Sequence, residues 1–224
     1  MNITRSFNYM EIHFYPGQHL LIINRGNIKF AQFEAMGGPA KVGNDPVMAE
    51  EPTWPGVYVI DKAEAYRTPT WPTSKLAWGT KLRDMPSKQD IWYALPSGKW
   101  GSLNQLYNSP VRSAIMEMHK ELYGKAIVPE AWVFNDFGPI AIRWFKDLNG
   151  NKLLDSIESL SGQMFHTTPD NEAETTLGSP VRLTLSHGCI HLKPNDRNRL
   201  FAIGAFKRGT SFTVHKYHER YKAN

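Results

Sequence analysis

Short apolar segments separated by turn residues run through the first third of the chain, and this pattern restricts it to a mainly β fold. Strands are predicted over residues 11–15, 19–23 and 28–33, with turns at Pro16-Gly17 and at residues 24–27 between them. Alternating strands and turns of this length are typical of a β-meander.

A fourth strand is predicted over residues 57–60, after a turn at 53–56 that reads Thr-Trp-Pro-Gly. The longest aliphatic clusters are as short as Leu20–Ile23, whereas a bilayer span needs roughly 18 apolar residues. We therefore expect no membrane span.

The composition is that of a globular protein. The 224 residues are 41% hydrophobic, 12% aromatic and 21% charged, which supports a buried core and argues against disorder or a fibrous repeat. The length indicates a single domain over residues 1–224.

Positive charge is concentrated at the C-terminal end. Residues 181–224 hold 9 Lys and Arg against 2 Asp and Glu, whereas residues 1–180 hold 17 against 19. This asymmetry suits an anionic substrate. The cations are spread out rather than clustered in a basic arm, so we expect no nucleic-acid partner.

The middle of the chain carries one clear helix, which Ser109-Pro110 begins and Gly124 ends. A second helix is predicted from Asn195 to Gly204, and strands are predicted over 131–134, 140–145 and 210–214. Residues 64–108 read as loops and short hairpins. Their tryptophans are interpreted as filling a small core or lining a cleft; they are Trp71, Trp78, Trp92 and Trp100.

The chemistry is expected around Cys189, which is the only cysteine and therefore forms no intrachain disulfide. Residues 186–191 read Ser-His-Gly-Cys-Ile-His, and His166 lies upstream. An imidazole that takes the proton of a thiol makes it a nucleophile. Gly188 allows a sharp turn that exposes backbone N–H groups beside the sulfur as an oxyanion hole, so acyl transfer is the natural chemistry.

Two metal sites compete with this interpretation. Cys189 and His191, with His166 and His187, are residue types that bind zinc, but the usual C-x₂-C or H-x₃₋₅-H pair is absent. Residues 147–158 are similar to a calcium loop, yet Lys152 stands where that loop needs glycine. An Asn149-Gly150 hairpin turn is the preferred interpretation, and no metal or cofactor is expected.

In these residues the chain resembles the catalytic domain of the L,D-transpeptidases, the YkuD family. The signature residues 186–190, the upstream His166 and most of the predicted strands match in order and spacing, whereas about 64–130 resembles a Trp-rich insertion. The resemblance implies a mainly β, sandwich- or barrel-like domain with a few helices.

The resemblance also implies that a cysteine attacks a peptidoglycan tetrapeptide stem, releases D-alanine and leaves a thioester. A D-amino acid, another amine or water resolves it, which gives transpeptidase, exchange or carboxypeptidase activity. Carried over by position, Cys189 is the nucleophile, His166 the general base, and the Thr167 carbonyl the group that orients His166. His187 helps to hold the substrate, and the Gly188 and Cys189 N–H groups form the oxyanion hole.

Substrate contacts are assigned to Ser186, His191 and Arg182, with Lys193 and Arg197 as further cations for substrate carboxylates. His191 departs from the Arg or Asn that the family commonly has at this position, and residues 170–180 are interpreted as a lengthened loop. These departures keep open a second hypothesis, a wall-binding module without turnover.

The expected place of action is the cell envelope or periplasm, or the wall of another cell after secretion. Residues 1–10 contain no apolar signal region. If Met1 is the natural start, an antibacterial effector delivered by a secretion system is one hypothesis. Oligomeric state is not predicted.

Overall fold

The computed structural model describes residues 9–45 and 48–222, and the chain divides into two compact units. The first comprises the described residues up to Glu64, together with 141–166 and those from Arg182 onward; the second comprises 65–140 and 167–181. A single domain with an insertion at about 64–130 remains a prediction.

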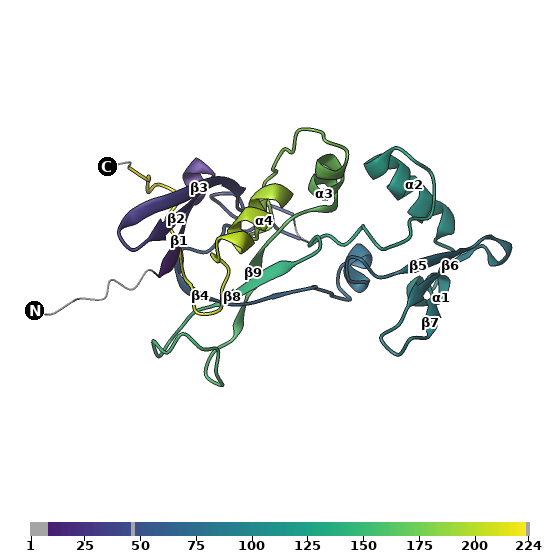
Figure 1. Cartoon of the computed structure of the whole chain (residues 1–224), viewed down its shortest axis with the longest axis horizontal. Helices are drawn as coiled ribbons and strands as arrows, with labels where there is room; N and C mark the ends of the chain where they lie inside the picture. The colour runs from purple at the N-terminus through teal and green to yellow at the C-terminus, as the bar shows by residue number, and fades with distance from the viewer. Residues whose placement is uncertain (1–8, 46–47, 223–224) are drawn as a thin grey trace, which may run out of the picture. The chain divides into compact units, whose positions relative to one another are not determined.

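The first unit is a closed barrel of eight strands in the order β1-β11-β4-β8-β9-β10-β3-β2. Figure 1 shows β1, β2 and β3 side by side, as their antiparallel pairing requires. The mainly β class is thereby confirmed. The strands are β1 (Met10–Tyr15), β2 (Leu20–Arg25), β3 (Ile28–Met36), β4 (Gly56–Glu64), β8 (Ala141–Phe145), β9 (Leu160–His166), β10 (Ile190–Leu192) and β11 (Ser211–Val214).

Alternating side chains from these strands form the barrel core, because every second residue of a strand points inward. Phe165 and Phe212 are fully buried and their ring centroids lie 4.8 Å apart; Trp144 packs edge-on against both. Helix α4 (Pro194–Ala202) follows β10 and buries Leu200. The second predicted helix is thus present, but it begins at Pro194 rather than being capped by Asn195.

The second unit contains a three-stranded antiparallel sheet, three α-helices and two short 3₁₀ helices, Pro72–Lys75 and Pro86–Lys88. The sheet joins β5 (Leu82–Met85), β6 (Asp90–Ala94) and β7 (Trp100–Ser102), which agrees with the short hairpins predicted there. Helix α2 (Arg112–Tyr123) is the clearest predicted helix and ends at Gly124, which has φ +74°. It begins after Val111, without a side-chain cap, rather than at Ser109-Pro110. Helix α1 (Leu103–Tyr107), capped by the Ser102 hydroxyl, was not predicted.

The core of the second unit differs from the one expected. Its buried side chains include Ile91, Ile115, Trp132 and Phe134, whereas the four tryptophans of 64–108 are only half-buried. The strand predicted over 131–134 is wrong, because only Ala131 makes an isolated bridge to Lys81.

The predicted loop over 170–180 is also wrong over most of its length. Helix α3 (Pro169–Thr176) occupies it, with the Thr168 hydroxyl accepting a hydrogen bond from the Asn171 N–H. The start of this helix could have been predicted from Thr168-Pro169, because a threonine followed by proline is a common helix start.

The predicted Asn149-Gly150 hairpin is replaced by a longer loop over 146–159 between β8 and β9. The Asp147 carboxylate accepts hydrogen bonds from the N–H groups of Gly150 and Lys152, and Glu158 accepts one from the Leu148 N–H. Lys152 has φ +61°, so this lysine adopts the conformation for which glycine is usual. Its presence at this position therefore does not by itself distinguish a calcium loop from another turn.

Candidate active site

The parallel pairing of β9 and β10 brings the predicted catalytic residues together. His191 of β10 lies opposite His166 of β9, and Ile190 lies opposite Phe165. Ile190 and Phe165 are fully buried on the core side, so the two histidines share the other face. Their ring centroids lie 4.7 Å apart, edge to face. Cys189 directly precedes β10, and the same register places it opposite Met164, two residues before His166 on β9.

The turn that carries Cys189 depends on Gly188 and Ser186. Gly188 has φ +111°, a region that side chains with a β-carbon rarely adopt, so the expected sharp turn is confirmed. The Ser186 hydroxyl accepts a hydrogen bond from the Gly188 N–H at 3.0 Å and donates to the Cys189 carbonyl. Ser186, which was predicted to contact substrate, is buried and holds the turn.

Residues far away in sequence fix the same turn. The buried Thr53 hydroxyl donates to the Gly188 carbonyl at 2.9 Å and accepts from the Gly38 N–H at 3.0 Å. The Gln163 amide of β9 packs against Gly188, donates to the Pro52 carbonyl and accepts from the Trp54 N–H. The turn that carries Cys189 is thus supported by both the β3–β4 connection and β9.

The thiol sits in an environment that disfavours its charged form. Burial raises the pKa of Cys189 from 9.0 to about 11, partly opposed by the Met164 N–H and by the positive charge of Arg143. We expected an imidazole to lower this pKa. The structure instead raises this pKa, which favours the neutral thiol at pH 7.

Arg143 is a site residue that the sequence did not reveal. It lies on β8 opposite Met164 of β9, and its charge reaches Cys189. Its guanidinium is held at 3.3 Å from Glu64 Oε1 and donates to the Ser161 carbonyl at 3.1 Å. An arginine inside a predicted strand carries no motif, so only the strand pairing could have identified it.

His191 is a neutral, fixed ring. Its Nδ1 lies 3.0 Å from the Thr184 carbonyl, and because a carbonyl only accepts, Nδ1 carries the proton. Burial is the main reason that the pKa of His191 falls to about 4, with His187 adding to it and the Thr184 bond opposing it. The ring therefore supports the site as an uncharged group.

The other predicted residues occupy different surroundings. His187 and Arg182 are exposed, whereas Thr167 is buried and its hydroxyl donates to Glu172. Lys193 pairs with Glu34 at 2.6 Å, and the buried Arg197 donates to the Asn198 side chain at 2.9 Å. These last two cations are engaged within the protein.

Within the described residues, no group of three or more His, Cys, Asp or Glu side chains is arranged to hold a metal ion. In the same part of the chain, no helix has the length and apolar character needed to cross a membrane.

The fold and the site define a β-barrel domain in which Cys189 directly precedes a strand that pairs with the strand of the buried His166. Residues 11–213 match the family described as YkuD, L,D-transpeptidase catalytic domain. The chain therefore belongs to this family, which acts on the peptidoglycan of the cell wall, and the resemblance seen in the sequence is confirmed. No curated protein matches the chain.

Several solved structures are similar at low identity. Mycobacterium tuberculosis L,D-transpeptidase 1 is 14% identical with a TM-score of 0.37, over 92% of this chain and 62% of that one. Bdellovibrio bacteriovorus Bd1075 is 16% identical with a TM-score of 0.41, over 96% and 51%. This chain thus spans about half to two thirds of their length, and family membership rests on the family match.

Proposed function

We propose that this protein catalyses acyl transfer on peptidoglycan stem tetrapeptides with Cys189 as the nucleophile. The observation that carries the proposal is the β9–β10 ladder, which puts His166 on the strand next to Cys189 and on the face away from the core. A thiol and an imidazole on adjacent strands form the nucleophile–base pair that this chemistry needs.

The raised thiol pKa determines how the first step proceeds. Because the thiol is neutral at pH 7, His166 takes its proton as the sulfur attacks the carbonyl carbon of the third stem residue. The positive charge of Arg143 stabilises the developing thiolate. The C–N bond to D-alanine then breaks, the leaving amine takes the proton from His166, and a thioester remains on Cys189.

The proposed oxyanion hole has one backbone N–H donor, whereas the sequence suggested two. The Gly188 N–H already donates to Ser186 Oγ, so we assign the Cys189 N–H as the backbone donor to the negative oxygen of the intermediate. An amine, a D-amino acid or water attacks the thioester in the second step, and its identity decides among cross-linking, exchange and carboxypeptidase activity. His187 and Arg182, which are exposed, remain our candidates for contacts with the substrate, and the Thr167 carbonyl for orienting His166.

The test is the intact mass of the protein after incubation with disaccharide tetrapeptide, with and without a D-amino acid. We expect a thioester adduct and release of D-alanine from the wild type, no adduct with Cys189→Ala, and a greatly slowed adduct with His166→Ala. Wild-type binding without adduct or product on several stems would instead support a wall-binding module. The place of action would be the cell envelope; delivery as an effector remains a prediction.

A further inference from the structure

The barrel has a second concave site at the end away from Cys189. The Cys189 end is marked by Met36, the last residue of β3, which pairs with His191. The opposite end is marked by the β2–β3 hairpin, where Arg25 pairs with Ile28 and with Met10. Nine residues of β3 separate the two ends, a distance on the order of 25 Å at the usual rise per residue.

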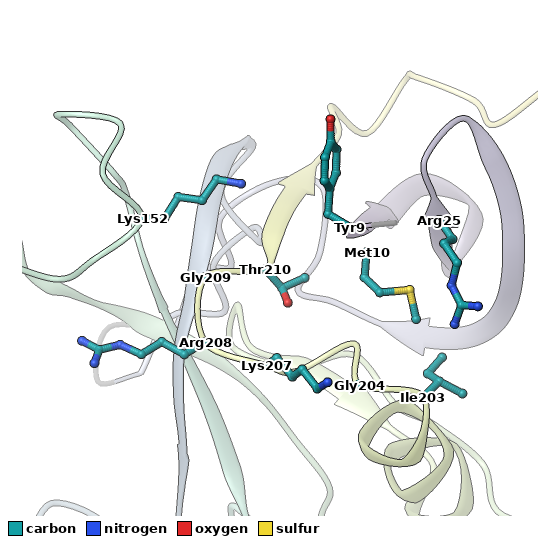
Figure 2. Close-up of a pocket in the computed structure, with 10 residues that line it drawn as sticks. All are labelled: Tyr9, Met10, Arg25, Lys152, Ile203, Gly204, Lys207, Arg208, Gly209 and Thr210. Atoms are coloured by element: carbon teal, nitrogen blue, oxygen red, sulfur yellow. The ribbon is translucent and has the colours of Figure 1, made fainter. Parts of the chain in front are cut away.

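A pocket of about 380 Å³ lies at this second end. Figure 2 shows its lining side chains, which come from the starts of β1 and β11, the end of β2, the 146–159 loop and the segment after α4. Four of them are cations, Arg25, Lys152, Lys207 and Arg208, and none of the described lining residues is acidic.

Two of these cations are held in position by their neighbours. The aliphatic chain of Lys207 lies against Gly204, where an added β-carbon would meet Lys207 Cε at 3.0 Å. The Arg25 guanidinium stacks 4.0 Å from the centroid of the Phe30 ring. Figure 2 shows the charged ends of Arg25 and Lys207 on the same side of the pocket, beside Ile203.

The other two cations, Lys152 and Arg208, contribute unequally to the positive charge of the pocket. Lys152 Nζ donates to Ser211 Oγ at 3.2 Å, which keeps its charge at the rim of the pocket. Arg208 lies 3.3 Å from the Asp61 carboxylate and points away from Lys207 in Figure 2. Arg25 and Lys207 therefore face the pocket and Lys152 lies at its rim, and none of the three has a carboxylate partner among the ion pairs of the described residues.

We propose that this pocket binds a phosphorylated sugar, either free or as the end of a polymer. Arg25 and Lys207, with Lys152 at the rim, match the charge of a phosphate better than that of a single carboxylate. An arginine fork binds phosphate through two hydrogen bonds. The volume is within the range of small-molecule sites, so there is room for the carbon skeleton that carries the phosphate. Ile203 and Met10 supply apolar contacts for that skeleton.

This site is independent of the acyl-transfer proposal, because none of the residues assigned to that reaction lines it. It also assigns part of the C-terminal positive charge to a ligand other than the stem peptide. Lys207 and Arg208 are part of that excess and lie at the far end of the barrel from Cys189, so they cannot bind the carboxylates of a stem peptide at the thiol.

The experiment is calorimetric titration of the whole protein with N-acetylglucosamine 1-phosphate, inorganic phosphate and N-acetylglucosamine. We expect the sugar phosphate to bind most tightly, inorganic phosphate more weakly, and the neutral sugar not at all. Arg25→Gln and Lys207→Gln should each weaken sugar phosphate binding about tenfold, and added salt should weaken it further. Lys41→Gln, which removes an exposed cation elsewhere in the first unit, should change the affinity less than about twofold.

Several results would overturn the proposal. Equal binding of the neutral sugar, or equal losses in Lys41→Gln and the pocket variants, would show that the pocket does not recognise the phosphate. Inorganic phosphate binding as tightly as the ester would contradict a role for the sugar. Binding only to vesicles of phosphatidylcholine and phosphatidylglycerol would indicate a lipid surface instead. Thermal unfolding of each variant confirms that the protein titrated is folded. Lys152→Gln tests the exposed cation at the rim of the pocket in the same titration.

Discussion

The side-chain amide of Gln163 occupies the space that a β-carbon on residue 188 would need. Gly188 also has φ +111°, so both its backbone conformation and the neighbouring Gln163 require glycine immediately before Cys189. Because Gln163 is tied to Pro52 and Trp54, it has little freedom to move away. The position of Cys189 therefore depends on a residue one strand away.

Gly188→Ala is expected to lower the free energy of unfolding by about 3 kcal/mol, from backbone strain and the overlap with Gln163. Thioester formation should fall at least tenfold even under conditions where the variant is folded, because the sulfur is displaced. Urea denaturation and the adduct assay measure the two effects. Gly162→Ala is the matched control, since an added β-carbon there meets no atom within 4 Å; equal losses in both variants would contradict this account.

The parts of this site that could be predicted from the sequence are those that lie close together along the chain. The first three strands and the sharp turn at Gly188 are local patterns, and both agree with the structure. The roles assigned to the run from Ser186 to His191 stay predictions, except that Ser186 is buried. Thr53, Gln163 and Arg143 reach the site through strand pairing, so no local pattern marks them. The predicted strand over 131–134 is wrong for a related reason: burial of Trp132 and Phe134 in the core of the second unit produces the same apolar run as a strand.

The raised pKa of Cys189 predicts slow alkylation at neutral pH. A thiol with a pKa of about 11 rather than 9.0 has about a hundredfold less thiolate at pH 7.5. Iodoacetamide should therefore react with the folded protein about a hundredfold more slowly than with a cysteine peptide, and the rate should still be rising above pH 9. Mass spectrometry against the same protein in urea measures this; a plateau below pH 8 would show a preformed thiolate.

Arg143 is expected to affect the thiol through its charge. Arg143→Gln removes a group that lowers the pKa of Cys189, so alkylation at a given pH should slow on the order of threefold to tenfold. Arg112→Gln removes an arginine that is paired with Asp84 in the second unit and should leave the rate unchanged. If Arg143→Gln lowers only the stability, with alkylation unchanged in the folded protein, its role is structural.

His191 should make the free energy of unfolding depend on pH. Its pKa is about 4 in the folded protein, chiefly because of burial, against an ordinary value of 6.5. Between these values the unfolded chain binds a proton that the folded protein does not, so stability is lost as the pH falls from 6.5 through 4. The loss is about 3 kcal/mol for this residue. Urea denaturation from pH 7 to 4 should show a smaller loss in His191→Asn, which cannot be protonated; parallel curves would contradict this.

The Thr53 hydroxyl holds the turn before Cys189 through two hydrogen bonds. It donates to the Gly188 carbonyl and accepts from the Gly38 N–H, and the side chain is fully buried. Thr53→Val keeps the shape but leaves both backbone groups buried without this partner, which should cost about 2–4 kcal/mol of stability.

Thioester formation in folded Thr53→Val should also slow, because the turn before Cys189 is no longer fixed. Thr176→Val changes an exposed threonine of α3 whose hydroxyl donates only to the Glu172 carbonyl. It should change stability by less than about 1 kcal/mol and leave the adduct rate unchanged. A Thr53→Val protein that keeps the wild-type rate would show that Gln163 and Ser186 alone position Cys189.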